Sequence, residues 1–371
     1  MEANIFLGIA LHAIGGLAAA TCFVPQKGTK KWSYQSFWLL MCISSWLVMP
    51  LIVAYLTVPE LAAVISETPM AVKVKMTVLG AAYGFGGMAF AMAIRHIGFS
   101  LTYAIAIGIS AVLGTLLPAI ENGTLLQDIS REGGGIVYSG LAVAMLGVII
   151  CARAGIYKER SLSAANPDDA QSFNIKKGLV LVVVAGVLSA IFGYALAAGA
   201  PMDAIAAKYG AGKTFMGFEA SVFQGNAKFI FAMGGAFITN IIWWGVVHTK
   251  EKTWGEYLNL TGKVTNLPKH YSMAIFAGIL WYCQFLFYGI GHVRMGDFQF
   301  ISWGIHMAML VFFSFGIGFI LREWKGVCGK TTKTLFAGLF VLLASFALIT
   351  YGSFAGQSAN TENTQRAKSG H

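Results

Sequence analysis

The chain is built from repeated runs of about 20 mostly apolar residues, the length that a helix needs to cross a bilayer. Only 11% of its 371 residues are charged, against about 25% in a typical soluble domain. So few charges cannot cover a water-facing surface of this size. Membrane strands alternate polar and apolar residues, and these runs do not, so helices are expected. The sequence therefore predicts an all-α integral membrane protein.

Ten spans are predicted at this length, connected by polar loops. They cover residues 4–24, 37–57, 72–94, 99–119, 134–152, 178–200, 221–247, 271–290, 299–321 and 334–353. Lys and Arg are about twice as frequent in the loops after the odd-numbered spans as on the other side. Because basic loops stay in the cytoplasm, both termini are predicted to lie on the outer side. The net charge of +10 is thus explained by topology, and no nucleic-acid partner is expected.

The ten spans divide into two halves of five. Residues 1–152 form the first five-helix repeat, 153–177 a basic cytoplasmic linker, 178–353 the second repeat, and 354–371 a polar tail that is predicted to be disordered. A unit with an odd number of spans, duplicated in tandem, inserts its second copy upside down. The sequence therefore predicts a five-plus-five inverted repeat, as in many secondary transporters.

Glycines are frequent inside the spans, where small residues let helix backbones approach closely. Gly80 and Gly84 stand four apart, on one face of the third span. The adjacent pairs Gly15–Gly16, Gly86–Gly87 and Gly234–Gly235 could also permit bending. Close packing is the simpler interpretation for most of them.

No carboxylate is expected at membrane depth. The nearest acids, which all map to the outward ends of spans, are Glu121, Asp203, Glu219 and Asp297. This argues against an exporter of cationic drugs, which commonly relies on a buried acid. Lys228 falls at the start of the seventh span, and its ammonium is expected to extend to the outer surface.

Two histidines lie well inside predicted spans. His12 and His306 are about eight residues into the first and ninth spans, roughly 12 Å deep. Imidazole takes up a proton near neutral pH, so these two residues are the candidates for proton coupling. The alternative is that each is held by an interhelical hydrogen bond and does not titrate.

Helical spacing groups polar and aromatic residues on two neighbouring spans. Trp281, Gln284 and Tyr288 share one face of the eighth span, and the ninth carries Ser302, Trp303 and His306. Flat apolar walls beside hydrogen-bonding groups suit a neutral sugar. Each tryptophan alone is better explained by packing or an interfacial belt. Gln284 is the stronger candidate, because an amide in a membrane helix is costly unless something binds it.

Covalent chemistry is not expected. The sequence shows no nucleophile triad, phosphate-cradling loop or metal-ligand cluster, and its five cysteines lack paired spacing. The chain is therefore predicted not to be an enzyme and to hold no metal or cofactor.

Several sequence blocks run in order from the first span to the ninth: "HAIGGLAAATCFVPQKGTKKWSYQSFW" (12–38), "SSWLVMP" (44–50), "AIAIGIS" (104–110), "FNIKKGLVL" (173–181), "WYCQFLFYGIGH" (281–292), and "ISWGIHM" with "LREW" (301–324). Together these blocks resemble the bacterial L-rhamnose–proton symporter family of the drug/metabolite transporter superfamily.

The resemblance implies a ten-helix transporter of the bacterial inner membrane that imports L-rhamnose with protons as the coupling ion. The substrate range would extend to related sugars such as L-lyxose. Rhamnose is neutral and carries a methyl group, so it needs hydrogen bonds, an aromatic platform and an apolar corner. Trp46 and His12 would contribute from the first half. The expected partners are a small-molecule sugar and the lipid bilayer.

Two other functions stay open. One is an exporter or uniporter of another small neutral metabolite. Binding measured across a panel of solutes would distinguish it from a rhamnose symporter. The other is a membrane sensor that binds sugar without transporting it, and counterflow measured in liposomes would distinguish a sensor from a transporter.

Overall fold

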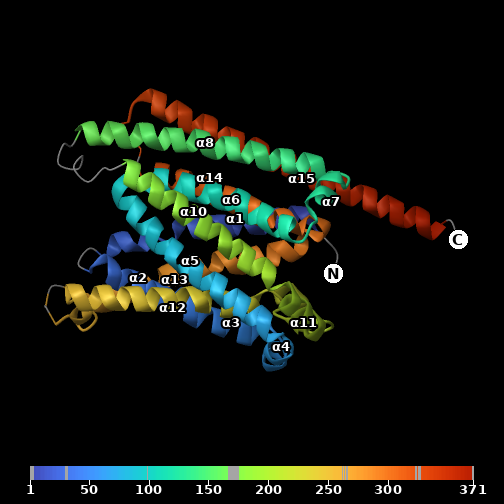
Figure 1. Ribbon diagram of the computed structural model, residues 1–371, viewed down its shortest axis with the longest axis horizontal. Coiled ribbons are helices and arrows are strands. Elements are labelled where there is room, and N and C mark those ends of the chain that lie inside the picture. The colour runs from blue at the N-terminus through green and yellow to red at the C-terminus, as the bar shows by residue number, and fades with distance from the viewer. Residues whose placement is uncertain are drawn as a thin grey trace. The chain divides into compact units, whose positions relative to one another are not determined.

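The computed structural model describes residues 4–29, 32–97, 99–165, 175–260, 262, 264, 266–321, 324 and 327–369. This part of the chain is almost entirely helical (Figure 1). Nine of its segments are long and apolar enough to cross a membrane, and each overlaps one predicted span. They are Ile5–Gly28, Tyr34–Thr57, Thr102–Glu121, Gly134–Lys158, Lys176–Ala198, Ala220–Glu251, Leu267–Arg294, Gly296–Ile320 and Gly329–Ser358. The prediction of an all-α membrane protein is confirmed at this level.

The predicted third span, 72–94, lies within α5 (Met70–Ile97). This helix of 28 residues is long enough to cross a bilayer, although it is not among the nine. The other long helices are α1 (Ile5–Thr21), α6 (Phe99–Glu121), α8 (Gly134–Ala165), α10 (Ile175–Ala198), α12 (Asn226–Glu251), α13 (Leu267–Arg294), α14 (Ser302–Ile320) and α15 (Gly329–Ser369).

The predicted second span is one continuous rod of three pieces. These are α2 (Tyr34–Cys42), a π-helical stretch η2 (Ile43–Val48) and α3 (Met49–Thr57). Shorter helices lie between the long ones or at their ends: η1 (Val24–Gly28), α4 (Leu61–Glu67), α7 (Leu125–Ser130), α11 (Ala200–Gly210), η3 (Ala220–Phe223), η4 (Trp254–Glu256) and η5 (Gly296–Ile301).

A small antiparallel hairpin is the one departure from an all-helical fold among the described residues. Its strands are β1 (Thr214–Phe215) and β2 (Phe218–Glu219). The two residues between them, Met216 and Gly217, both have positive φ. Such backbone matches the twist of a two-residue hairpin turn.

The chain divides into two compact units. Unit 1 comprises Met1–Gly16, Ala89–Ala190 and Gly291–His371, and unit 2 comprises Leu17–Met88 and Ile191–Ile290. Each unit takes segments from both halves of the chain. This division is therefore a different one from the predicted sequence repeats, whose inverted relation stays a prediction. Part of the predicted linker, residues 166–174, lies outside the described residues.

In unit 1, α8 and α15 lie side by side along much of their length (Figure 1). Gly140 and Gly147 stand seven residues apart on α8, and Gly338 and Gly352 stand fourteen apart on α15. Each pair therefore lies on one helix face. A Cβ atom at Gly140, Gly147, Gly338 or Gly352 would come within 2.6–2.9 Å of an atom of the facing helix. The missing side chains allow this close approach, as expected where helices associate in lipid.

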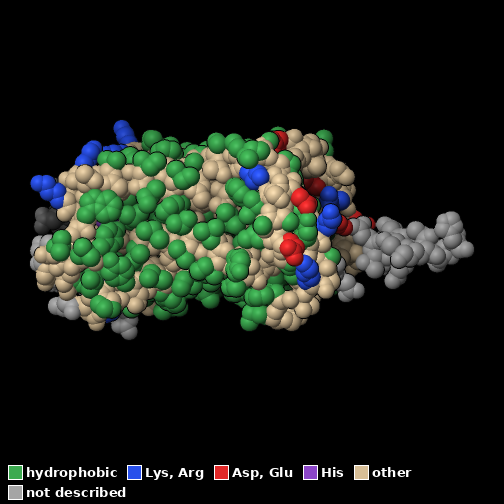
Figure 2. All heavy atoms as spheres, turned by 90° about the horizontal axis from the view of Figure 1, so that it is seen from below, with side chains coloured by type: hydrophobic (Ala, Val, Ile, Leu, Met, Phe, Trp, Pro, Cys, Tyr) green, Lys and Arg blue, Asp and Glu red, His purple; other side chains and the backbone are tan. Residues whose placement is uncertain are grey.

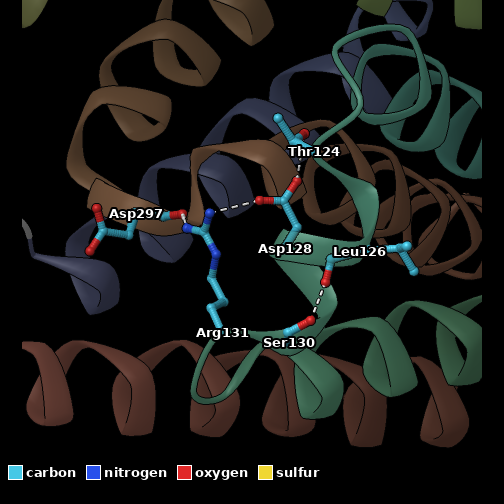
Figure 3. A network of polar contacts seen from close by, with 6 residues as sticks. All are labelled: Thr124, Leu126, Asp128, Ser130, Arg131 and Asp297. Carbon is cyan, nitrogen blue, oxygen red and sulfur yellow. Dashed lines mark hydrogen bonds and ion pairs between the residues drawn. The ribbon is translucent and has the colours of Figure 1, made fainter.

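The loop that contains α7 is tied to the segment after α13 by a polar network in unit 1 (Figure 3). The Arg131 guanidinium donates to Asp128 Oδ1 at 2.7 Å and to the backbone oxygen of Asp297 at 2.5 Å. Thr124 Oγ1 donates to the other oxygen of Asp128 at 3.0 Å. These loops follow the predicted fourth and eighth spans, which the alternation of spans puts on one side of the membrane.

In unit 2, α12 packs closely on the first part of α5. A Cβ at Gly80 would lie 1.9 Å from the backbone oxygen of Ala232, and one at Gly235 would lie 2.0 Å from that of Thr77. Asn240 Nδ2 donates to the backbone oxygen of Gly84 at 3.2 Å. The predicted role of the glycines in the third span as a close-packing surface is confirmed.

Glu256 joins two loops of unit 2 that were predicted to lie on the same side. Its Oε2 accepts hydrogen bonds from the Ser33 backbone N–H, the Ser33 hydroxyl and the Ser36 hydroxyl, at 2.7–2.8 Å. Gln35 Nε2 donates to Glu251 Oε2 at 2.6 Å. The start of the second span is therefore held to the end of the seventh.

In the structure, α15 continues into the predicted polar tail as far as Ser369. Residues 357–369 contain neither glycine nor proline. A helix that has already formed extends through such a segment without a second nucleation step.

The surface of the protein is largely apolar. On the face shown in Figure 2, hydrophobic side chains cover a broad area, and acidic and basic side chains gather away from it. Exposed apolar residues of α3 and α12 include Leu51, Ile52, Tyr55, Ile242 and Val246. Surface of this kind is matched by lipid, which agrees with the membrane-length helices.

Candidate functional site

The predicted site residues fall into two groups, one in each unit. The group in unit 2 lies on α13, where Trp281, Gln284 and Tyr288 are all more than nine-tenths buried. Gln284 is 4% exposed, and its amide makes no hydrogen bond within the part of the chain that the structure describes. Gln284 therefore has hydrogen-bonding capacity that the protein itself does not use.

Trp46 lies against the same face of α13. Its ring meets that of Trp281 edge to face, with centroids 5.1 Å apart, and lies 6.0 Å from the ring of Tyr83. Trp46 belongs to the π-helical stretch η2, a type of local insertion that is frequent at functional sites. Among the described residues, its buried Nε1 has no hydrogen-bond partner. The Trp46 N–H and the Gln284 amide thus both lack hydrogen-bond partners among the described residues of unit 2, where the rings of Trp46 and Trp281 are in contact.

Tyr83 was not identified from the sequence as a member of this cluster. It lies on α5 within the glycine-rich stretch "YGFGG", and its ring is tilted against that of Phe192 with centroids 4.4 Å apart. An aromatic residue between glycines is the only signal in the sequence. That pattern does not show which helix the ring will face.

The second group lies in unit 1. The rings of His12 on α1 and His306 on α14 are 6.1 Å apart between centroids, and both side chains are fully buried. The sequence put both at similar depth without showing that they are neighbours. Two imidazolium charges at this separation in a buried site would repel each other. The pair can therefore hold one proton more readily than two.

Trp303 and Ser302 begin α14 in the same unit. Trp303 Nε1 donates to the backbone oxygen of Ser110 on α6 at 2.9 Å. Its ring fills the space at Gly114, where a Cβ would lie 2.3 Å from Nε1. Ser302 is fully buried, and its hydroxyl has no partner among the described residues. Trp303 thus fixes α14 on α6. That the faces of α13 and α14 meet in one pocket stays a prediction.

Lys228 does not extend to the surface, so that expectation was wrong. It is 4% exposed, and its Nζ lies 2.5 Å from Oδ2 of Asp203, which is 7% exposed. The acid comes from α11, which stands before α12 in the chain. Burial raises the pKa of Asp203, and the neighbouring Lys228 ammonium opposes this shift. The sequence carried one signal for this ion pair. Asp203 and Lys228 have opposite charges and stand at the starts of consecutive α-helices.

Comparison with known proteins agrees with the resemblance found in the sequence. A sequence profile described as L-rhamnose-proton symport protein matches residues 1–355. Proteins named L-rhamnose-proton symporter occur in Escherichia coli (strain K12 / DH10B), Shigella dysenteriae serotype 1 (strain Sd197) and Citrobacter koseri (strain ATCC BAA-895 / CDC 4225-83 / SGSC4696). Each is 31% identical over 353 residues, which cover 95% of this chain and 99% of the relative. The family comprises transport proteins and not enzymes. The chain belongs to the L-rhamnose-proton symport protein family.

Proposed function

We propose that this protein imports L-rhamnose together with protons across the bacterial inner membrane. Ten spans, arranged as a five-plus-five inverted repeat with both termini in the periplasm, would carry out alternating access. The family supplies the substrate class and the coupling ion. The observation that carries the site is the Gln284 amide, which makes no hydrogen bond among the described residues, together with the buried and unpartnered Trp46 N–H beside the ring of Trp281.

The chemistry of this group suits a neutral sugar. The Gln284 amide can both donate to and accept from hydroxyl groups, and the Trp46 N–H can only donate. Trp281 and Tyr288 add flat apolar surface for the C–H face of the ring and for the methyl group of rhamnose. L-lyxose keeps the ring hydroxyls and lacks this methyl group. We therefore expect it to bind, more weakly than L-rhamnose.

His12 and His306 are the proposed carriers of a coupled proton. Both are buried in spans, where ionisable side chains are rare and commonly functional. Their closeness supports a shared proton. Ser302 and Trp303 of α14 stay proposed sugar-contacting residues, as predicted from the sequence.

Alternating access needs helices that can bend. The chain passes from one unit to the other within α1 and α5, after Gly16 and after Met88. The glycine pairs Gly15–Gly16 and Gly86–Gly87 stand next to these points. Because a glycine backbone rearranges at low cost, these pairs support bending of α1 and α5 at these points.

The substitution Gln284→Met tests the sugar site. The methionine side chain fills the same space but cannot hydrogen-bond. Because no bond within the protein is lost, we expect the variant to fold with unchanged or higher thermal stability. L-rhamnose affinity should fall about tenfold or more, since one sugar hydroxyl loses its partner. Isothermal titration of the purified protein measures this.

Gln35→Met is the matched control for Gln284→Met. Gln35 is also buried in unit 2, but its amide is bonded to Glu251. The control should lose stability and keep its affinity for the sugar. Normal L-rhamnose binding by Gln284→Met would contradict the proposed site.

Proton coupling is tested by His306→Gln in proteoliposomes. Sugar-driven alkalinisation of the medium should fall relative to sugar taken up, whereas sugar exchange without a proton gradient should continue. His270→Gln replaces a buried histidine of unit 2 that is bonded to the backbone of Asn266, and it should leave coupling unchanged. Wild-type protein that binds sugar but shows no counterflow would be a sensor. Wild-type uptake without proton movement would indicate a uniporter.

A further inference from the structure

The ion pair between Asp203 and Lys228 lies entirely within unit 2 and is closed to bulk water. Its two charged groups are 2.5 Å apart, and each side chain is at least nine-tenths buried. The fit is close, because a Cβ at Gly199 would lie 2.8 Å from Cδ of Lys228. A larger residue at position 199 would displace the lysine. The local packing therefore accommodates this side chain specifically.

The position of Lys228 is unfavourable for a purely structural residue. It lies in the first turn of α12, where the partial positive charge of the helix N-terminus repels a cation. Removing the ammonium from water adds a further penalty. Replacement of such pairs by apolar residues is often neutral or stabilising, so stability alone is a weak reason to keep one.

Asp203 has one oxygen engaged and one open. Oδ2 accepts the hydrogen bond from Lys228, whereas the buried Oδ1 has no partner in the described part of the chain. Asp128 in unit 1 is a buried aspartate of the ordinary kind, with Thr124 on one oxygen and Arg131 on the other. Oδ1 of Asp203 therefore offers a free lone pair for a proton.

Lys228 is the charged group that acts most directly on Asp203. Tyr288 of α13 lies within electrostatic reach of this carboxylate. The other described charged and titratable groups on α4, on α11, on the part of α5 in unit 2 and in the loops beside these helices have contacts of their own. Those contacts are Glu67 with Tyr209, Lys73 with the backbone of Ile65, Lys75 over the ring of Tyr194, Tyr83 against the ring of Phe192, Lys208 over the ring of Tyr209, and Lys213 with Glu60.

We propose that Asp203 is a protonation site of the transport cycle, in addition to the histidine pair of unit 1. A hydronium ion transfers its proton to Oδ1 of the carboxylate: an O–H bond of the hydronium ion breaks, an O–H bond of the carboxyl group forms, and a water molecule is released. The charge of the pair rises from zero to +1. Release on the other side of the membrane reverses the step. This inference rests on the proposed proton symport.

Protonation also provides a link to the sugar site. A neutral carboxyl group attracts the Lys228 ammonium far less than a carboxylate does. Binding of the proton therefore loosens the contact between α11 and α12 and opens the closed pair. Tyr288, one of the proposed sugar-contacting residues, lies near enough to sense the change in charge. The burial-raised pKa of Asp203 favours uptake of the proton.

Asp203→Asn in proteoliposomes tests the proposal, with Asp128→Asn as the matched control. For each proton coupled to one sugar, an imposed gradient of one pH unit supplies about 1.4 kcal/mol, which supports about tenfold accumulation of the sugar. The steady accumulation of L-rhamnose is measured against the gradient, together with counterflow, which needs no net proton movement. We expect Asp203→Asn to lose about tenfold per pH unit and to keep its counterflow. Asp128→Asn should match wild type.

Accumulation by Asp203→Asn equal to that of wild type would overturn the proposal. So would a parallel loss of sugar binding and counterflow in a folded variant, since that would make Asp203 a ligand of the sugar. Wild-type protein without proton-driven accumulation would refute the proposed function instead.

Lys228→Arg is a second test variant that keeps the ion pair. It tests the proposal if Asp203→Asn does not fold. A guanidinium can engage both carboxylate oxygens, including Oδ1. The pH midpoint of coupled uptake should then move down by about half a unit or more, with unchanged sugar affinity. An unmoved midpoint would overturn the proposal.

Discussion

Two adjacent glycines of α12 should respond in opposite ways to the same substitution. A Cβ at Gly235 would lie 2.0 Å from the backbone oxygen of Thr77 and 2.8 Å from the backbone nitrogen of Ala81, both on α5. A Cβ at Gly234 would have nothing within 4 Å. Gly235→Ala and Gly234→Ala therefore add the same methyl group to the same helix, one against a backbone and one into open space.

The expected difference between the two variants follows from these contacts. Backbone atoms of α5 cannot rotate away, so α5 and α12 must separate, and overpacking of this kind costs about 1–3 kcal/mol. Separation also weakens the hydrogen bonds from Thr239 to Ala81 and from Asn240 to Gly84, each worth about 0.6 kcal/mol in a membrane helix pair. Alanine gains about 1 kcal/mol over glycine in helix propensity.

The net loss for Gly235→Ala is about 2 kcal/mol, and Gly234→Ala should be neutral or gain up to about 1 kcal/mol. Unfolding of the purified protein with increasing SDS in mixed micelles, followed by tryptophan fluorescence, measures both free energies. Gly245→Ala, another open glycine of α12, is a second control. Equal stability of the Gly234 and Gly235 variants would refute the assignment of Gly235 to the helix contact.

Two further substitutions test single contacts. Trp303→Phe removes the hydrogen bond to the backbone oxygen of Ser110 and leaves that oxygen buried, so we expect a loss of about 1–2 kcal/mol in the same unfolding assay; unchanged stability would show that this bond does not hold α14 on α6. Burial raises the pKa of Tyr257, whose hydroxyl donates to the backbone oxygen of Ser36. The neutral phenol is favoured in the folded state, so its stabilisation is present below about pH 10 and is lost as the pH rises further. Tyr257→Phe should therefore be less stable than wild type at pH 8 and should lose less of its stability toward pH 11; parallel curves would contradict the shift.

The sequence predicted the membrane helices well because lipid imposes a simple rule. Any run of about 20 apolar residues must satisfy its backbone within one helix, whatever its neighbours are. Gly80 and Gly84 were predicted correctly as packing residues for a similar reason, since a four-residue spacing fixes a helix face. That α12 faces them depends on tertiary contacts that no single span contains.

Lys228 shows why the polar groups were harder to place. Its position near the start of a predicted span suggested access to water. The structure instead adds the short helix α11, which brings Asp203 onto the ammonium. Short helices between spans carry weak signals in a sequence, because they are neither long nor apolar. They nevertheless decide whether a charge near a span end is exposed or buried.

Gln35 and Gln284 show the same limit with one residue type. Both are buried in unit 2, and both stand in or next to apolar segments. Gln35 is bonded to Glu251, which is 216 residues away in the sequence. Gln284 has no such partner among the described residues, although a methionine would fill the same space without any polar group. The same unit leaves the buried Trp46 N–H without a partner among the described residues. A visiting hydroxyl-bearing solute accounts for both groups at once, whereas packing accounts for neither.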